Sequence, residues 1–117
     1  MEFPAGVKVY YIRDKNNAPV LSVAIKRNGD TGTIIRATAH CSTLDKVSKK
    51  KGRMIAVNRL VHYEKKGVVG VGHVPPPERN RINPDSLLHW HSGIYLMRCN
   101  GAFCQPMDFE KRILKMN

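Results

Sequence analysis

Residues 20–41 read VLSVAIKRNGDTGTIIRATAHC, and their pattern predicts two strands of a β-sheet. Apolar and polar side chains alternate along both of its halves, Val20–Arg27 and Thr33–Cys41, and this period of two is typical of β-strands. Between the halves lies Asn28-Gly-Asp-Thr-Gly32, whose residues accept the positive φ angles of a tight turn. The sequence therefore predicts an antiparallel hairpin.

The segment before the hairpin adds a third strand. Val7–Arg13 is rich in Val, Tyr and Ile, and turn-forming residues follow it at positions 14–19. In the last of the three strands, the alternation predicts an apolar face with Ile35 and Ala37 and a polar face with Arg36 and His40. The sequence thus predicts a three-stranded meander in which Arg36 belongs to the polar side.

A basic helix is predicted after the hairpin, beginning at Ser42 or Thr43, either of which can cap its first turn. Residues 41–60 hold six cations against one acid, Asp45. The cations are Lys46, Lys49, Lys50, Lys51, Arg53 and Arg59. So much like charge on one element favours an anionic partner. Gly52 weakens the helix further; it either admits a partner helix or a ligand, or it faces solvent.

The C-terminal half contains further strands and a second helix. A glycine-weakened strand is predicted at Gly67–Val74, a loop at Glu78–Ser86, and a strand or strand pair at Leu87–Arg98. Asn100-Gly101 predicts a turn, and Pro106 predicts the start of a short helix. The helix residues expected to pack are Phe109, Ile113 and Met116, and those expected outside are Lys111, Arg112 and Lys115.

The elements together predict one α+β domain spanning residues 1–117. It contains an antiparallel sheet of about four to six strands, a central basic helix and a short C-terminal helix. The chain has 20 Lys and Arg residues against nine Asp and Glu, a net charge of +11 and a pI near 10.0. This imbalance favours a polyanion, a phosphate-bearing small molecule or an acidic membrane surface, the alternative being a basic domain whose charge serves only solubility.

The cysteines and the hydropathy bear on location. Three cysteines cannot all pair, and neither a secretory leader nor a membrane-spanning apolar run is recognised. We therefore expect thiols in a reducing cytoplasm and no membrane partner.

Catalytic and metal-binding patterns are weak. His89-Trp-His91, Cys99 and Cys104 lack the close, regular spacing of zinc ligands. His40 and Cys41 are neighbours in a strand, so their side chains point to opposite faces and cannot form a dyad. The sequence therefore predicts a protein that is not an enzyme and uses neither a metal nor a cofactor.

Arginine-rich surfaces suit phosphate, because the guanidinium fork can hold two phosphate oxygens. Arg53 and Arg59 on the helix, with Arg36 on the preceding strand, are candidates for such a surface. The chain has one Trp, four Tyr and three Phe, and few of them lie among these cations. Single-strand binders normally place aromatic platforms among their cations, so a general nucleic-acid role is less favoured.

The pattern Ala39-x-Cys-Ser-x-x-Asp-x-x-Ser-Lys-Lys-x-Gly-Arg-x-Ile-Ala-x-x-Arg-Leu60 resembles small proteins encoded by bacteriophages, and most of all the phage anti-Thoeris sponge family. The resemblance implies a compact α+β protomer that forms a dimer or higher homo-oligomer. It also implies intersubunit pockets that hold cyclic ADP-ribose-type signals without cleaving them, in the cytoplasm of the bacterial host.

Site residues follow from the same resemblance. Arg59 matches the arginine of the central helix, and the basic positions of the C-terminal helix fall on Lys111, Arg112 and Lys115. Candidates for the base are the aromatic Trp90, with Tyr95, and the amide Asn83, with Asn80.

The first functional hypothesis is therefore a non-enzymatic protein that sequesters a phosphate-bearing nucleotide signal and so counters bacterial immunity. The alternatives are a small nucleic-acid-binding protein and an inhibitor that docks on an acidic host protein. The first hypothesis predicts that Arg59→Ala abolishes nucleotide capture and leaves the fold intact.

Overall fold

The computed structural model describes residues 3–13, 19–40, 49–68 and 100–116 of the chain. Four strands and two helices lie in these ranges: β1 Lys8–Arg13, β2 Pro19–Arg27, β3 Ile34–His40, α1 Lys49–Lys66, β4 Gly101–Cys104 and α3 Asp108–Ile113. The α+β class, the antiparallel sheet, the central helix and the short C-terminal helix are confirmed.

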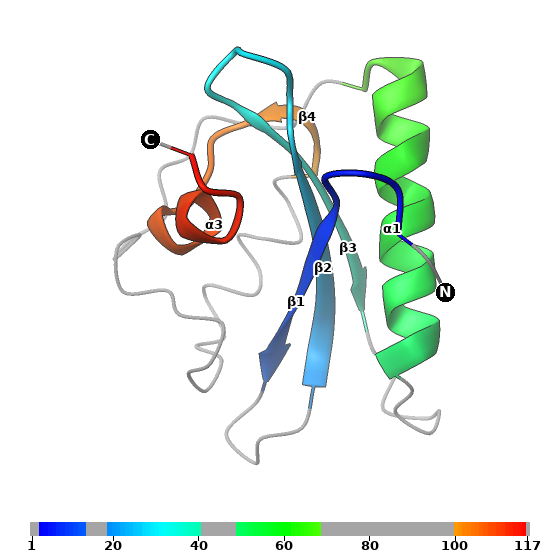
Figure 1. The fold of residues 1–117 in the computed structure, drawn as a ribbon. Coiled ribbons are helices and arrows are strands. Elements are labelled where there is room, and N and C mark those ends of the chain that lie inside the picture. The colour runs from blue at the N-terminus through cyan, green and yellow to red at the C-terminus, as the bar shows by residue number, and fades with distance from the viewer. Residues whose placement is uncertain (1–2, 14–18, 41–48, 69–99, 117) are drawn as a thin grey trace.

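The sheet is antiparallel, with its four strands in the order β1-β2-β3-β4 (Figure 1). The predicted hairpin joins β2 to β3, with Ala24 opposite Ala37. Its turn closes through a 3.0 Å bond from the amide N of Asn28 to the carbonyl O of Thr33. Gly29 and Gly32 adopt φ angles of 59° and 77° there, which other residues adopt only at a steric cost.

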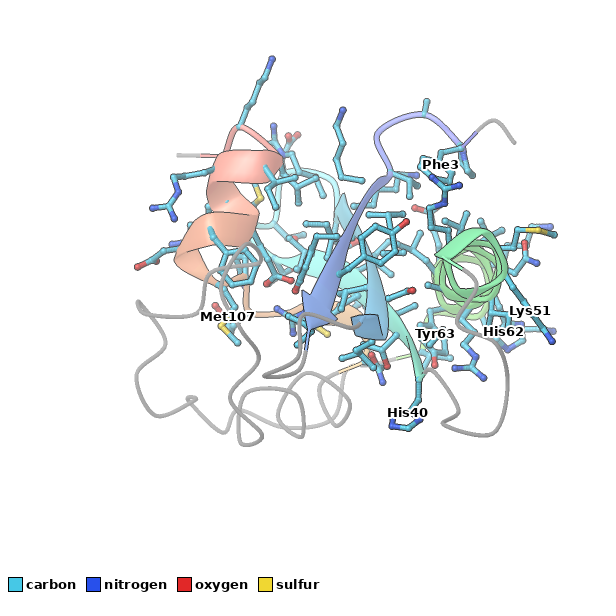
Figure 2. The ribbon with its side chains drawn as sticks, turned by 90° about the horizontal axis from the view of Figure 1, so that it is seen from below. Phe3, His40, Lys51, His62, Tyr63 and Met107 are labelled. Carbon is cyan, nitrogen blue, oxygen red and sulfur yellow. The ribbon has the colours of Figure 1, made fainter. Side chains whose placement is uncertain are left out.

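The two helices cover opposite faces of the sheet, α1 on one side and α3 on the other (Figures 1 and 2). The central strand β2 is consequently buried on both faces. Leu21, Val23 and Ile25 point toward α3, and Ser22 and Ala24 point toward α1. The predicted alternation of side chains between the two faces of β2 is therefore found, but the face that carries Ser22 is covered by α1.

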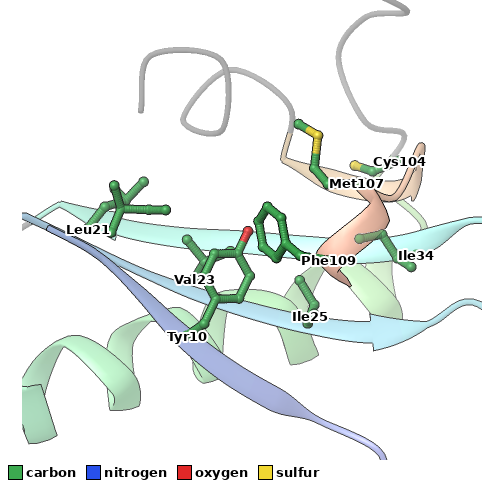
Figure 3. Close-up of a cluster of buried hydrophobic side chains, with 9 residues drawn as sticks. Tyr10, Leu21, Val23, Ile25, Ile34, Cys104, Met107 and Phe109 are labelled. Atoms are coloured by element: carbon green, nitrogen blue, oxygen red, sulfur yellow. The ribbon is translucent and has the colours of Figure 1, made fainter. Parts of the chain in front are cut away.

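The larger apolar residues pack on the α3 side of the sheet, in the cluster shown in Figure 3. Its buried members are Tyr10, Ile12, Leu21, Val23, Ile25, Ile34, Cys104, Met107 and Phe109. The rings of Tyr10 and Phe109 meet edge to face at 5.1 Å between centroids, a favourable geometry for aromatic pairs. Ile113 and Met116 pack against this cluster, as predicted.

Small residues dominate the α1 side, where Ala24, Ala37, Ala39, Ala56 and Ala102 are all buried. They allow α1 to lie close to the sheet, and Gly52 marks the tightest approach. A Cβ at that position would be 2.5 Å from Oγ of Ser22. Gly52 is therefore needed for packing against β2. The alternative that this glycine simply faces solvent is wrong, and the close approach that the sequence allowed for is made here by a strand of the same chain.

The C-terminal elements differ from the prediction in two places. Gly101, the second residue of the expected turn Asn100-Gly101, begins the strand β4 (Gly101–Cys104), and Phe103 in this strand has a φ of 62°. The helix α3 begins at Asp108, two residues after Pro106, because Met107 is extended with ψ of 160°.

Several predictions lie outside the described residues. They are the cap at Ser42 or Thr43 and the segments Gly67–Val74, Glu78–Ser86 and Leu87–Arg98, although 67–68 are described.

Candidate anion-binding site

Positive charge is concentrated in the described ranges. They contain fifteen of the Lys and Arg residues and four acidic residues, so the net excess of +11 belongs to them. Three of the four acids face cations, in the pairs Arg36–Glu110, Lys26–Glu64 and Arg27–Asp30. Most of the remaining cations whose side chains are described are exposed to solvent.

Four cations line a pocket of about 310 Å³, namely the paired Lys26 and Arg27 together with Lys8 and Lys115. The pocket lies where β1 begins, β2 ends and the chain leaves α3. The lining residues are Gly6, Lys8, Lys26, Arg27, Ile113, Leu114 and Lys115. Four of these seven carry positive charge, and two offer apolar contact, so the pocket matches a ligand with an anionic part and an apolar part.

The strand register brings three of the cations together. Lys8 lies opposite Ile25 in the β1–β2 ladder, which places it beside Lys26 and Arg27 at the end of β2. The chain enters β1 through a turn at Gly6, which has a φ of 81°. Residues far apart in sequence therefore line one side of the pocket because the two strands run antiparallel.

The fourth cation, Lys115, is presented by the end of α3. The amide of Met116 donates to the carbonyl of Lys111 at 2.8 Å, and the amide of Lys115 donates to that of Arg112 at 3.2 Å. This pair of bonds defines a Schellman motif, whose left-handed residue is usually glycine. Here it is Lys115, with a φ of 55°. A lysine pays about 1–2 kcal/mol in this conformation.

The four cations are neutralised unequally. Nζ of Lys26 lies 2.7 Å from Glu64, whereas Arg27 is 4.0 Å from a fully exposed Asp30, a contact that contributes little in water. Neither Lys8 nor Lys115 forms an ion pair with a carboxylate in the described ranges. The pocket therefore keeps a positive potential.

The predicted site residues are distributed over several surfaces. Lys115 lines the pocket, and Arg112 is exposed and Lys111 partly buried elsewhere on α3. Arg53 and Arg59 lie on α1, across the sheet from α3. Trp90 and Asn83 lie outside the described residues.

Arg59 links its helix to the sheet. Its Nη1 donates to the carbonyl O of Thr38 at 2.7 Å, although the side chain is exposed. One N–H of the five on a guanidinium suffices for this bond. The predicted convergence of Arg59 with the C-terminal helix is not found within one chain, because the sheet separates them.

Arg36 was predicted on the polar face of its strand, and we expected it to be exposed. The structure differs, because α3 covers that face of β3. The side chain is completely buried. Its Nε donates to Oε2 of Glu110 at 3.0 Å and its Nη2 to Oε1 of the same carboxylate, as well as to the carbonyl O of Gln105 at 3.0 Å. Burial alone would lower the pKa of Arg36, but the charge and hydrogen bonds of Glu110 raise it above its ordinary value.

Glu110 connects this arginine to two more groups. It accepts a 2.8 Å bond from the hydroxyl of Tyr10 and a 2.8 Å bond from the amide of Met107. Burial, and then the nearby Glu110 charge, raise the pKa of Tyr10 well above its usual value. The network fixes α3 on the sheet and thereby positions the end of α3 beside the pocket.

Sequence reasoning missed Gly6, Lys8, Lys26 and Arg27 as site residues. A weak signal exists: the two strands carry cations at the ends that an antiparallel pairing brings together. The depth of the pocket depends on the end of α3, whose position over the sheet the sequence did not show.

In the described part of the chain, no three His, Cys, Asp or Glu side chains are grouped as metal ligands. Cys104 is a buried thiol there, and its Sγ donates to the carbonyl O of Gly101 at 3.2 Å. None of the helices in the described ranges has an apolar stretch long enough to cross a membrane.

Comparison with known proteins finds no match. No family model, curated protein or solved structure is significantly similar to this chain.

Proposed function

We propose that the protein binds a compact, phosphate-bearing ligand without chemically changing it. The observation that carries the proposal is the pocket of about 310 Å³ lined by Lys8, Lys26, Arg27 and Lys115. Three separate segments of the chain contribute these cations to one lining.

The lining favours a phosphate joined to a ring. Lysine ammonium groups act as point charges toward phosphate oxygens, and Arg27 offers a planar fork for two of them. Ile113 and Leu114 give an apolar wall for a ring. The volume lies at the lower end of the range for small-molecule sites, so it suits a phosphate or pyrophosphate with one attached ring.

In its specific form, the proposal is that the ligand is a nucleotide signal of the cyclic ADP-ribose type, as the sequence resemblance implies. Capture would lower the free concentration of the signal and so deprive its receptor by mass action. A cyclic molecule with two phosphates and two riboses would extend beyond one such pocket. A second copy of the chain would then cover the protruding part, and Arg59 or Arg112 would come from that copy.

Isothermal titration calorimetry with inorganic pyrophosphate, ADP and cyclic ADP-ribose tests the proposal. Lys8→Gln and Lys115→Gln should each weaken binding by about tenfold or more, because each removes a charge-assisted contact. Lys51→Gln is the matched control, since it removes the same charge from an exposed position on α1. No binding of any of the three ligands, or an equal loss in the control variant, would overturn the proposal.

Native mass spectrometry tests the remaining parts. It reports the number of subunits together with any retained molecule, and the ligand released on heating should be chemically intact. A hydrolysed product would contradict a purely binding role. Arg59→Ala should abolish capture only if a second copy completes the site, so unchanged affinity in that variant restricts binding to the pocket of one chain.

A further inference from the structure

One of the pocket cations, Lys26, is shared between the pocket and the helix α1. Lys26 lines the pocket, and its Nζ lies 2.7 Å from Oε2 of Glu64. Glu64 is the one acidic residue in the sequence of α1. The free protein therefore already holds a carboxylate on a cation that a phosphate in the pocket would use.

The alternation of side chains along β2 explains why Lys26 reaches α1. Ser22 and Ala24 point toward α1, and Lys26 belongs to the same face of the strand. Lys8 lies opposite Ile25 in the β1–β2 ladder, so its side chain is on the α3 side. The cations of the pocket consequently come from both faces of the sheet.

The stem of Lys26 passes beside Gly6, which also lines the pocket. A Cβ built on Gly6 would lie 3.9 Å from both Cγ and Cε of Lys26. Gly6 has no side chain to separate this stem from the pocket, and the stem of a lysine is flexible. The ammonium group can therefore turn from Glu64 to a ligand by rotation of one side chain, without a movement of the backbone.

The ion pair between Lys26 and Glu64 is weak enough to be exchanged. The two side chains are 28% and 42% exposed, and an ion pair so accessible to water contributes little to stability. The pair Arg36–Glu110 is the opposite case, because both of its side chains are fully buried and the loss of either partner leaves a charge in the interior. Water can solvate the Glu64 carboxylate as soon as Lys26 leaves it.

Packing of α1 does not require this ion pair. The helix buries an apolar face against the sheet, and this face includes Val57 and Leu60. Apolar burial of this kind holds a helix in place without charged contacts. The pair joins the last turn of α1 to the end of β2, so its loss should lower stability only slightly.

We propose that Glu64 competes with the ligand for Lys26, an inference that rests on the proposed function of the pocket. In the free protein the Glu64 carboxylate holds the Lys26 ammonium group. When a phosphate enters, the ammonium group exchanges this carboxylate for phosphate oxygens, with which it forms charge-assisted hydrogen bonds. A weakly charged anion gains too little from Lys26 to displace Glu64, so the exchange makes the pocket selective for phosphates.

Calorimetry with inorganic pyrophosphate and with ADP tests the exchange on the native chain, Glu64→Gln, Lys26→Gln and the double variant. Glu64→Gln should tighten binding by about threefold to fivefold, which is the free energy of a partly exposed ion pair expressed as affinity. On the Lys26→Gln background the same change should alter affinity by less than about twofold, because only a screened charge at a distance is removed. Circular dichroism confirms that each variant is folded.

Asp30→Asn is the matched control. Asp30 is fully exposed and lies 4.0 Å from Arg27, another pocket cation, so its removal should change affinity by less than about twofold. An unchanged or weaker affinity in Glu64→Gln, an equal gain on the Lys26→Gln background, or an equal gain in Asp30→Asn would each overturn the inference.

Failure of this inference is distinguishable from failure of the proposed function. If the native chain binds pyrophosphate or ADP and the gain in Glu64→Gln is absent, the competition by Glu64 is excluded and the pocket remains a phosphate site. If the native chain binds neither of them nor cyclic ADP-ribose, the proposed function and the competition are both overturned.

Discussion

Arg36 and Glu110 form a completely buried ion pair between β3 and α3, across 74 positions of sequence. Two hydrogen bonds join the guanidinium to the carboxylate, and Tyr10 and the amide of Met107 donate to the same carboxylate. These partners of the Glu110 carboxylate belong to the sheet or to the start of α3. The pair therefore determines where the short helix docks.

Removing one member of the pair should destabilise the protein strongly. Glu110→Ala leaves the Arg36 guanidinium buried without its counter-charge, and the expected loss is about 3–5 kcal/mol of unfolding free energy. Urea denaturation followed by circular dichroism measures it. The double variant Arg36→Met/Glu110→Leu should recover a large part of that loss, since apolar replacement of a buried pair is often tolerated. A single variant as stable as the native chain would contradict the structure.

The stability of the fold should fall in alkali because of Tyr10. Its pKa in the fold is raised by burial and by Glu110, above the value of 10.0 that applies in the unfolded chain. The unfolded phenol therefore ionises first, so the stabilisation is complete below pH 10.0 and is lost as the pH rises further.

Urea midpoints measured between about pH 9 and about pH 11 test this, because an ordinary phenol ionises in that range. Tyr10→Phe should be less stable at neutral pH, since the bond to Glu110 is lost, but its stability should decline less steeply in alkali. Tyr63→Phe, which removes a phenol from α1, should keep the native decline. If the stability of Tyr10→Phe declined with pH as steeply as that of the native protein, Tyr10 would not be the source of the decline.

The contact between Gly52 and Ser22 should reverse the usual effect of alanine in a helix. Gly→Ala inside a helix normally stabilises by about 1 kcal/mol. Here the new Cβ would lie 2.5 Å from Oγ of Ser22, so Gly52→Ala should destabilise by about 1–3 kcal/mol through overpacking.

Removing the hydroxyl should restore the normal effect. Oγ of Ser22 is buried and has no hydrogen-bond partner in the described part of the chain, so Ser22→Ala should be nearly neutral. On that background Gly52→Ala leaves a 3.4 Å contact with Cβ of residue 22 and should become neutral or stabilising. Thermal unfolding of the four proteins in this cycle measures the coupling, and additive effects would contradict the close approach.

The hairpin could be predicted from sequence because a period of two and glycine-containing turns are local properties. The burial of both faces of the sheet could not be predicted from sequence, because Ser22 and Ala24 are equally suited to a surface and to a tight contact with a helix. Arg36 illustrates the same limit. An arginine on the polar side of a strand has the same local pattern whether it meets water or a carboxylate far along the chain.

The candidate site was less predictable than the fold. Lys115 was predicted as an outward-facing basic residue of the C-terminal helix and as a ligand-binding residue, but its companions Lys8, Lys26 and Arg27 come from strand ends. Their meeting depends on the strand register together with the docking of α3. No spacing within one element carries that information.

Lys115 gives the sharpest test of the pocket, because its role in the ligand site opposes its role in stability. Its φ of 55° is unfavourable for lysine, and glycine adopts it without a Cβ penalty. Lys115→Gly should therefore stabilise the fold by up to about 1 kcal/mol, which is the smaller end of the penalty for a side chain in this region. Thermal unfolding should show a raised Tm.

The same substitution should weaken the binding of pyrophosphate or ADP, because it removes one of the two pocket lysines, Lys8 and Lys115, that form no ion pair with a described carboxylate. Calorimetry on the stabilised variant separates the two effects, since a loss of affinity could not be attributed to unfolding. Lys111→Gly is the control: it removes a charge from the helix α3, which precedes Lys115, at a position that does not line the pocket, and it should lower stability because glycine disfavours a helix interior. If Lys115→Gly raised the Tm and left the affinity unchanged, the strained lysine would have no part in ligand binding, and the pocket would lose its main support as a phosphate site.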